Sequence, residues 1–297
     1  MPTHPIPAFV NPASGSGEAA RDALEGVGGF EVVACDPEHL DRQIERAVSE
    51  GAERIVVAGG DGTVAKAAAA LVGKKTALAV VPGGTLNHFA KGHGIPHDPV
   101  KAAELSAHGV TTTIDVATVN GRVFLNTSSV GAYVVFVRAR ERLEPRFGYR
   151  VASVIAAFRL LGRIRPFTVE LEIDGQPRRY RSALVFVGVG ERELQLPSVG
   201  GLAENGRRGL HVIVVRGGTW ARLVAAGLVA AFGGDDAMRR GRLADSYVVD
   251  ACRIELRRRR GRVAVDGEIV EMSSPLRYRI ERNALRLVVS PDHARDE

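Results

Sequence analysis

The stretch VAGGDGTV, residues 57–64, joins an apolar run, RIVVA (54–58), to an alanine-rich run, VAKAAAALVG (64–73), that favours a helix. Glycine tolerates positive φ and lets a ligand approach the backbone without a Cβ in the way. At the carboxyl end of a strand, such a turn exposes backbone N–H groups beside the positive end of the next helix dipole, where phosphate binds well. The stretch therefore predicts a strand, a phosphate-binding turn and a helix.

The same alternation of short apolar runs and helical patterns extends through the first 120 residues. Four runs are typical of strands: 6–10, 29–35, 54–58 and 76–82. Five segments are typical of helices: 18–25, 37–52, 64–73, a segment that begins at LNHFAKGHG (86–94), and 98–109, with Gly109 as its C-cap. Strands that alternate with helices predict a parallel, doubly wound sheet.

From residue 111 onward, strand patterns dominate. Asn120-Gly121 and Asp174-Gly175 are signals for type I′ hairpin turns between alternating runs. Helical patterns interrupt the strands at about 147–162 and 219–232. This half of the chain is therefore predicted to be a large antiparallel β domain, with the boundary near residues 110–125.

Composition restricts the class of protein. The chain has 297 residues, 45% of them hydrophobic, and a formal net charge of +6. This length suits two domains, and the positive charge favours anionic partners such as nucleotides, nucleic acid or an acidic lipid surface. A basic composition without a specific partner explains the charge equally well.

Targeting signals and disulfides are not expected. No apolar run reaches the roughly 18–20 residues that span a bilayer, and the N-terminus lacks the pattern of a secretory signal. Cys35 and Cys252 lie far apart without metal-ligand spacing, so we interpret them as free thiols of a cytosolic protein.

Two further loops resemble the first in composition. VNPASGSG (10–17) follows the first predicted strand, and VPGGTLNHFA (81–90) follows the fourth. Because the carboxyl ends of parallel strands share one edge, the three loops predict a single nucleotide cradle rather than three plain turns. A carboxylate beside phosphate is repulsive, so Asp61 faces a Mg²⁺ ion or a ribose or substrate hydroxyl, or else caps the helix that follows it. Thr63 caps the helix or donates to phosphate.

These motifs carry a resemblance. NPASGSG, GGDGTV and PGGTLNHFA, in this order and spacing, resemble the diacylglycerol kinase catalytic-domain superfamily, which includes bacterial soluble lipid kinases, sphingosine kinases and ceramide kinases. GGDGT alone is also found in NAD kinases and phosphofructokinases, and PGGTLNHFA separates the lipid-kinase branch from them. VAVDGEIV (263–270) resembles the DGE turn of the superfamily, so the resemblance covers nearly the whole chain.

The resemblance implies a fold and a domain organisation. The expected fold is a doubly wound, NAD-kinase-like α/β N-terminal domain with a C-terminal antiparallel β-sandwich, and ATP lies in the cleft between them. The expected domains are residues 1–120 for nucleotide binding and 121–280 for the lipid substrate. A final segment, 281–297, is expected to return to the first domain.

The resemblance also implies site residues. The nucleotide-site positions are Asn11, Gly59, Gly60, Asp61, Gly62, Thr63, Thr85 and Asn87. The expected catalytic residues are Glu268, Asp266 beside it and Asp61. Glu268 could accept the proton of a substrate hydroxyl, although a turn residue in solvent is the structural alternative.

The chain departs from the superfamily pattern at two places. His88 stands where the superfamily usually has Asp, and Glu204-Asn205-Gly206 stands where an Asp-Asp-Gly segment usually holds a structural Mg²⁺. Asparagine lacks the charge that a hard cation prefers, so the metal ligands stay unassigned.

The expected function is that of a cytoplasmic, ATP- and Mg²⁺-dependent lipid kinase of phospholipid biosynthesis. It would phosphorylate a hydroxyl of diacylglycerol or a similar lipid, touch anionic membrane transiently from the periphery, and bind no nucleic acid. The alternatives are an NAD-kinase-like kinase of a soluble small molecule and a catalytically weak nucleotide- or lipid-binding protein. The sequence names neither the lipid nor the oligomeric state.

Overall fold

The computed structural model describes residues 5–36, 38–131, 146, 148, 155, 166–173, 176–192, 206–216, 244–256 and 258–296. The predicted turn at Asp174-Gly175 and the segment Glu204-Asn205 lie outside the described residues, as do the predicted helices at about 147–162 and 219–232 apart from single positions. The chain forms two compact units: unit 1 comprises Met1–Val116 and Glu281–Glu297, and unit 2 comprises Ala117–Ile280. The predicted domains, residues 1–120, 121–280 and 281–297, stay a prediction.

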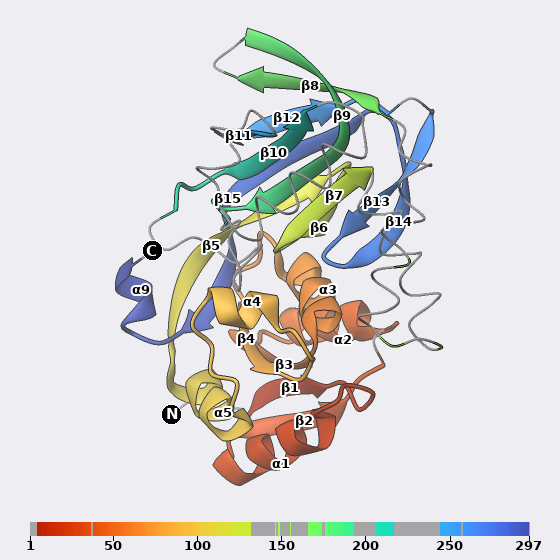
Figure 1. Cartoon of the computed structure of the whole chain (residues 1–297). Coiled ribbons are helices and arrows are strands. Elements are labelled where there is room, and N and C mark those ends of the chain that lie inside the picture. Colours follow the sequence, from red (N-terminus) through yellow and green to blue (C-terminus); the bar gives the residue numbers. More distant parts are fainter. Residues whose placement is uncertain are drawn as a thin grey trace. The chain divides into compact units, whose positions relative to one another are not determined.

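Unit 1 is built on a parallel sheet (Figure 1). Its strands are β1 (Ile6–Val10), β2 (Phe30–Ala34), β3 (Arg54–Gly59) and β4 (Ala77–Pro82), in the spatial order β4-β3-β1-β2. The end of β15 (Leu276–Val289) continues this sheet beside β4, in parallel, with Leu287 opposite Leu78. Every residue of β4, and all but the first of β3, is buried, as expected for strands with helices on both faces.

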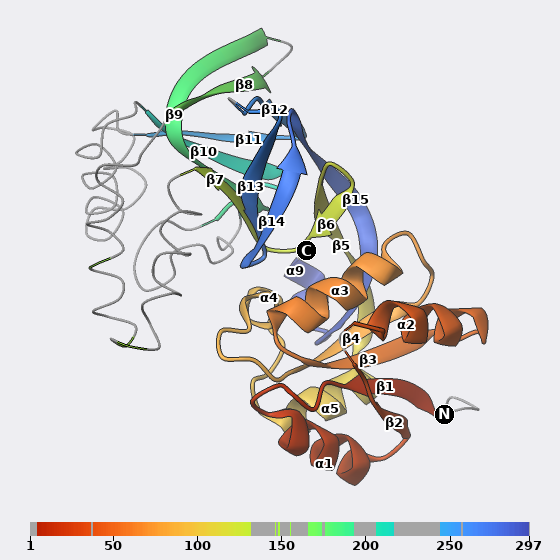
Figure 2. The same cartoon turned by 90° about the vertical axis from the view of Figure 1, so that its right-hand side faces the viewer.

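Helices cover both faces of this sheet (Figure 2). They are α1 (Gly17–Val27), α2 (Leu40–Ser49), α3 (Asp61–Leu71), α4 (His88–Gly92) and α5 (Pro99–His108). Contacts join α1 to α5 on one face and α2 to α3 on the other. Leu24, Ile44 and Leu71 are fully buried from three of these helices, so each helix contributes an apolar stripe to the core.

The two ends of α5 show how the local sequence sets helix limits. Asp98 accepts a hydrogen bond from the Lys101 N–H (2.9 Å), and Pro99 occupies the first turn, where its missing N–H costs nothing. Gly109 is the C-cap as predicted, and its N–H donates to the Leu105 carbonyl at 2.7 Å, with a φ of −63° that is not left-handed. A Cβ there would lie 2.6 Å from the Leu105 carbonyl oxygen, so lack of space explains the glycine.

Unit 2 consists of antiparallel strands. They are β6 (Arg122–Phe124), β7 (Thr127–Gly131), β8 (Phe167–Ile173), β9 (Gln176–Val189), β10 (Leu210–Arg216), β11 (Ala244–Val249), β12 (Ala251–Ile254), β13 (Arg260–Val265) and β14 (Glu268–Ser273). The chain enters the unit through β5 (Val110–Val119) and leaves it through β15. The spatial order is β14-β13-β7-β9-β8-β12-β15, with β10 also paired to β9, β11 to β10, and β5 to both β15 and β6.

The long strand β9 takes part in both layers of unit 2. Its first half pairs with β8, and its second half pairs with β7 and β10. The change occurs at Ser182, which lies opposite Phe167 of β8 and Arg216 of β10. Alternate residues of both layers, such as Val169, Val187 and Tyr278, form one buried core. The predicted fold class, an α/β part followed by an antiparallel β-sandwich, is confirmed, while the nucleotide cleft between the parts stays a prediction.

The predicted hairpin turn at Asn120-Gly121 and the DGE turn at Asp266-Gly267 have the geometry of type I′ turns. Asn120 and Gly121 have φ values of 49° and 83°, and Asp266 and Gly267 have 45° and 87°. A type I′ turn needs positive φ at both central residues. The flanking residues Val119 and Arg122 are paired, as are Val265 and Glu268, so both hairpins are confirmed.

Cys35 and Cys252 are free and buried. Among the residues that the structure describes, no helix has the length and apolarity needed to cross a membrane.

Candidate nucleotide and catalytic site

The three glycine-rich loops of unit 1 meet at the carboxyl edge of its sheet. The Gly83 N–H donates to the Gly59 carbonyl (2.8 Å), and the Ser16 N–H donates to the Gly83 carbonyl (3.3 Å). The Asn11 N–H donates to the Ala58 carbonyl (2.9 Å). These backbone bonds tie the loops after β1, β3 and β4 to one another, which is the convergence that the sequence predicts.

The glycines of these loops permit a close approach between the loop backbones. A Cβ on Gly84 would lie 2.7 Å from the Cα of Gly60 and 2.9 Å from Oδ1 of Asn87. A Cβ on Gly59 would lie 2.7 Å from the Cβ of Thr63. Real side chains do not tolerate such separations, so the packing of the loops already requires glycine at both positions.

Asn11 and Thr63 form a buried pair beneath the loops. Asn11 Nδ2 donates to Thr63 Oγ1 at 3.0 Å, and Asn11 Oδ1 accepts the Ala13 N–H at 3.0 Å. Among the described residues no side chain caps the N-terminus of α3, so of the two predicted roles of Thr63 the cap is not formed and the hydrogen bond to phosphate stays a prediction. The first N–H groups of α3 have no carbonyl one turn earlier to bond, so they face the loops as donors.

Asp61 holds the start of the short helix α4. Its Oδ2 accepts the His88 N–H and its Oδ1 accepts the Phe89 N–H, both at 3.1 Å. Asp61 therefore caps a helix in this structure, but the helix is α4 and not α3, which it begins. An ionised carboxylate has about four acceptor positions, so capacity remains for a ligand.

The side chain of Asn87 forms hydrogen bonds within its own loop. Its φ of 48° is left-handed, its Oδ1 accepts the Gly84 N–H at 2.9 Å, and its Nδ2 donates to the Gly84 carbonyl at 2.7 Å. Thr85 and His88 are exposed, and Gly62 is partly buried at the first turn of α3. The eight predicted nucleotide-site residues thus lie on these three loops, and Asn87 shapes the site from within.

In unit 2, Asp266 fixes the backbone beside its turn. Its carboxylate accepts the N–H groups of Leu125 (2.7 Å), Asn126 (2.8 Å) and Thr127 (3.0 Å). Burial raises the pKa of Asp266, while these three donors and the positive charge of Arg192 act in the opposite direction. Asp266 therefore positions the hairpin and does not extend toward solvent.

Glu268 is the first residue after this turn, and its side chain is exposed to solvent. Its Oε2 pairs with Nη2 of Arg122 at 2.6 Å, and both side chains are about half exposed. Since Glu268 and Asp266 share a hairpin that Asp266 anchors, the backbone of Glu268 is held firmly while its carboxylate stays accessible. Asp61 belongs to unit 1, so a site that joins Asp61 with Glu268 stays a prediction.

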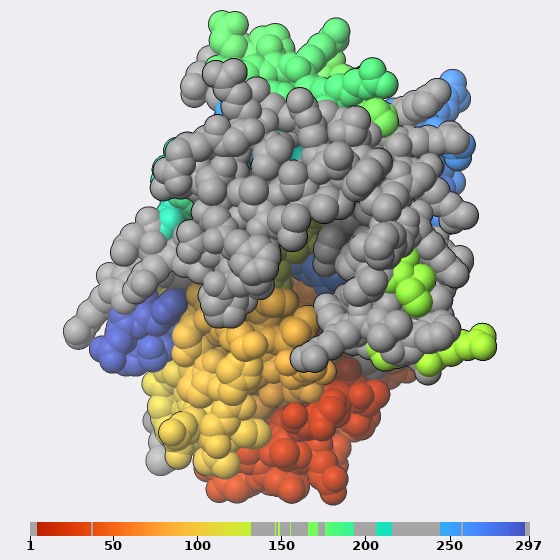
Figure 3. All heavy atoms as spheres, viewed as in Figure 1, coloured from red at the N-terminus to blue at the C-terminus, as the bar shows by residue number. Residues whose placement is uncertain are grey.

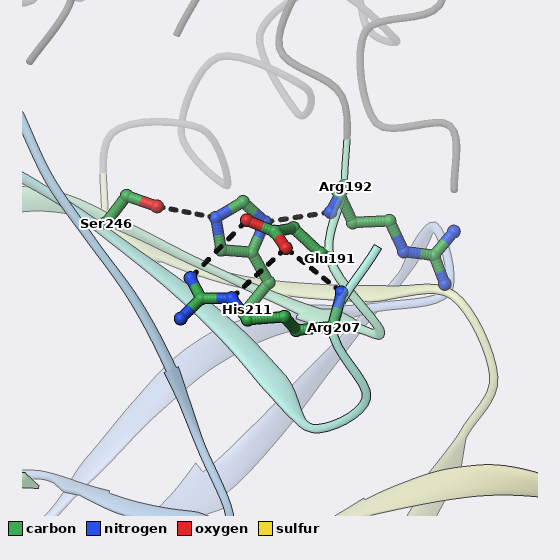
Figure 4. A network of polar contacts seen from close by, with 5 residues as sticks. All are labelled: Glu191, Arg192, Arg207, His211 and Ser246. Carbon is green, nitrogen blue, oxygen red and sulfur yellow. Dashed lines mark hydrogen bonds and ion pairs between the residues drawn. The ribbon is translucent and has the colours of Figure 1, made fainter. Parts of the chain in front are cut away.

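The structure also contains a polar network that the sequence does not predict (Figure 4). The Arg192 N–H donates to His211 Nδ1 (2.9 Å), so the proton of the neutral imidazole is on Nε2, which bonds Ser246 Oγ at 2.6 Å. Beside it, Glu191 pairs with Arg207 at 3.3 Å. Burial lowers the pKa of Arg192 to about 10, although the charge of Asp266 opposes this shift. These partners are far apart in the sequence, so no local pattern could have found them.

Neither a metal cluster nor a surface hollow in unit 1 adds a second site among the described residues. Among the described residues, no group of three or more His, Cys, Asp and Glu side chains is arranged to hold a metal ion. A shallow hollow of about 1150 Å³ lies between α1 and α5, and its described lining contains none of the predicted site residues. The candidate residues therefore form two groups, the three loops of unit 1 and the Asp266–Glu268 hairpin of unit 2, and a site that joins the two groups stays a prediction.

Comparisons with known proteins agree with the motifs. Residues 5–119 match the diacylglycerol kinase catalytic domain. A diacylglycerol kinase of Mycobacterium tuberculosis is 32% identical over 184 residues, which are 57% of this chain and 59% of that protein. One from Staphylococcus aureus is 27% identical over 190 residues, 60% of each chain. The chain thus spans about 60% of the length of these curated relatives.

Solved structures support the fold over the whole chain. The crystal structure of a diacylglycerol kinase from Bacillus anthracis aligns with a TM-score of 0.68 and 21% identity, over 98% of this chain and 99% of the other. A second structure from the same organism gives a TM-score of 0.72 with 22% identity, over 97% and 98%. At this identity the likeness concerns the fold alone.

Proposed function

We propose, because this chain belongs to the diacylglycerol kinase catalytic-domain superfamily, that it is an ATP-dependent lipid kinase. The reaction would transfer the γ-phosphoryl group of ATP to a hydroxyl of diacylglycerol or a similar lipid. The protein would work at the periphery of a membrane as a cytoplasmic enzyme.

The observation that carries the proposal is the convergence of the three loops on the first turn of α3. The loop backbones touch at Gly60 and Gly84, and none of the side chains that the structure describes caps the N–H donors of the helix. Such a helix start binds phosphate through its donors and its dipole. Asn11 and Thr63 support the turn from below and keep the donors in place.

The residues present fit ATP with Mg²⁺. Mg²⁺ usually keeps several waters and binds one or two carboxylates together with substrate phosphates, so a full protein cage is unnecessary. Asp61 is the carboxylate at the loops, and its remaining acceptor positions suit this use. When bound, the cation neutralises charge that develops on the transferred phosphoryl group.

Glu268 is our candidate general base. Its carboxylate would accept the proton of the lipid hydroxyl while the hydroxyl oxygen forms its bond to the γ-phosphorus and the bond to ADP breaks. Arg122 restrains the side chain, and Asp266 fixes the hairpin backbone. His88 does not serve as the base in this proposal. Its backbone N–H donates to Asp61, and its exposed side chain has no role in the proposed proton transfer.

A radiolabelled-ATP assay against a panel of lipids, with NAD as a soluble acceptor, tests the proposal. Thin-layer separation should reveal a labelled lipid that requires both ATP and Mg²⁺. Label on NAD alone would support the soluble-substrate kinase. ATP binding without label on any acceptor would support the catalytically weak binding protein.

A further inference from the structure

The outer face of four adjacent strands in unit 2 is rich in arginine. One row across β9, β8, β12 and β15 holds Arg179, Glu170, Arg253 and Arg277. Arg181 and Arg279 lie two residues further along β9 and β15, and side chains two apart in a strand share a face. We call the five exposed residues Arg179, Arg181, Arg253, Arg277 and Arg279 the arginine face.

The opposite face of the same strands supplies the core of the sandwich. Val169, Ile254, Leu276 and Tyr278 are buried there. The alternation leaves the arginines outside, where side chains of the β8–β9 hairpin, drawn in green, project from the surface (Figure 3). Packing of the core therefore does not require arginine at these positions.

The charges of this face do not cancel. Arg179 pairs with Glu170 at 2.6 Å, and Arg253 pairs with Glu255 at 2.6 Å. Arg181, Arg277 and Arg279 make no ion pair within the part of the chain that the structure describes. Arg277 also lies directly opposite Arg253 in the β12–β15 pair, and like charges in this position are unfavourable. Three uncompensated cations thus occupy a face that gains no stability from them.

We infer that the arginine face docks on an anionic lipid surface. This inference rests on the proposed function, because a kinase that acts on a membrane lipid must meet the bilayer. Neighbouring strands lie about 4.8 Å apart, so four strands present their guanidinium groups over an area about 15 Å wide. A guanidinium group bonds phosphate oxygens in a bidentate manner, which suits a plane of phospholipid headgroups.

The width of the arginine face favours a lipid surface over nucleic acid. The major groove of a duplex admits one helix or a two-stranded ribbon, and a face of four strands is too wide to enter it. A bilayer has no groove and accepts all five arginines at once. Duplex DNA is therefore kept as a competing outcome of the test.

The experiment measures partition of the full chain onto vesicles without ATP and without diacylglycerol. Vesicles of equal phosphatidylglycerol and phosphatidylcholine are compared with pure phosphatidylcholine at low and high salt. The variant R181Q/R277Q/R279Q removes the three uncompensated charges, and R181K/R277K/R279K keeps them. The matched control R42Q/K74Q/K75Q neutralises three exposed residues of unit 1.

The wild type and the lysine variant should bind anionic vesicles in a salt-sensitive manner. The glutamine variant should lose about 100-fold in partition coefficient, at about fivefold for each basic residue. The unit 1 control should lose far less. If the glutamine variant and the unit 1 control lost vesicle binding equally, net charge alone would explain the binding, and the inference would be overturned. Unchanged vesicle binding by the glutamine variant, or a loss confined to duplex DNA in a parallel titration, would also overturn it.

A second measurement separates this inference from the proposed function. The glutamine variant should phosphorylate a water-soluble, short-chain diacylglycerol at the wild-type rate. Normal vesicle docking without phosphorylation of any lipid would defeat the proposed function and leave the docking face. Lipid phosphorylation by the wild type, together with unchanged docking by the glutamine variant, would support the proposed function and overturn the docking face.

Discussion

The three candidate carboxylates differ in how many hydrogen bonds they accept from the protein. Asp61 accepts two backbone N–H groups, and Asp266 accepts three. Within the part of the chain that the structure describes, Glu268 bonds the exposed side chain of Arg122 alone. A carboxylate that must accept a proton from a substrate needs a free oxygen, so Glu268 is the best suited of the three.

Glu268→Gln should lower kcat by about 10²–10⁴ and leave ATP affinity nearly intact, because the amide keeps the shape of the side chain but not its basicity. The matched control is Glu271→Gln, an exposed glutamate on the same strand, β14, which should keep wild-type kinetics. Steady-state kinetics with circular dichroism on each variant make the comparison. A near-normal Glu268→Gln enzyme together with an inactive His88→Ala enzyme would move the base to the histidine.

Two glycines should respond in opposite directions to the same substitution. Gly84→Ala places a Cβ 2.7 Å from the Cα of Gly60, so the two loops must separate, and ATP affinity and thermal stability should both fall. Gly26→Ala lies in helix α1 with nothing within 4 Å of the new Cβ, so it should stabilise the protein by about 0.5–1 kcal/mol. Thermal unfolding and ATP titration check both. Wild-type ATP affinity in a folded Gly84→Ala protein would place the nucleotide elsewhere.

At the scale of the element, helix α4 depends on a residue from another helix. It has only five residues, and its N-cap Asn87 makes no side-chain cap bond to it. Asp61, the first residue of α3, supplies the cap instead through the His88 and Phe89 amides. The loop of the nucleotide cradle and the helix after it therefore form or loosen together.

Asp61→Ala should destabilise the protein by about 1 kcal/mol and speed hydrogen exchange at the His88 and Phe89 amides, because both lose their acceptor. Turnover should also fall. The matched control is Asp98→Ala, which removes the cap of α5 at a comparable cost in stability. If Asp98→Ala lowers turnover as much as Asp61→Ala, the effect of Asp61 is one of general stability and its proposed role at the phosphates is lost.

Local patterns predicted the elements that local physics determines. The apolar runs of β3 and β4, the helix α5 with Gly109 as its C-cap, and the two positive φ values at Asn120-Gly121 follow from residues within a few positions of each other. Contacts between distant residues were not predictable from such patterns. The capping of α4 by Asp61 and the approach of Gly84 to Gly60 need the sheet to be assembled first.

At the scale of the whole molecule, unit 1 is made from two separated segments of chain. Leu285, Leu287, Val288 and Val289 of β15 are buried in it, at 1% exposure or less. Bonds from this segment reach other parts of the unit, including the Gly73 N–H to the Ala284 carbonyl at 2.8 Å. Unit 2 is therefore an insertion between the two segments of unit 1.

A chain truncated after Ile280 should fail to fold unit 1, since it loses four buried aliphatic side chains that each contribute about 1.5–3 kcal/mol. Removal of residues 292–297, which takes away only the short helix α9 (His293–Asp296), should leave the unit folded. Amide spectra and ATP titration of both truncated proteins make the test. A well-folded unit 1 without residues 281–297 would contradict the structural role assigned to β15.

The same insertion has a consequence during protein synthesis. A ribosome produces β1 to β4 early, then the whole of unit 2, and only afterwards the part of β15 that lies beside β4. Until that part has been translated, the nascent sheet lacks a strand that contributes to its core, so the proposed nucleotide loops have no finished support. A polypeptide released from a stalled ribosome before residue 281 would contain unit 2 but an incomplete unit 1, and it would be a target for proteases. Nucleotide binding by this protein would thus report that translation has proceeded past its second unit.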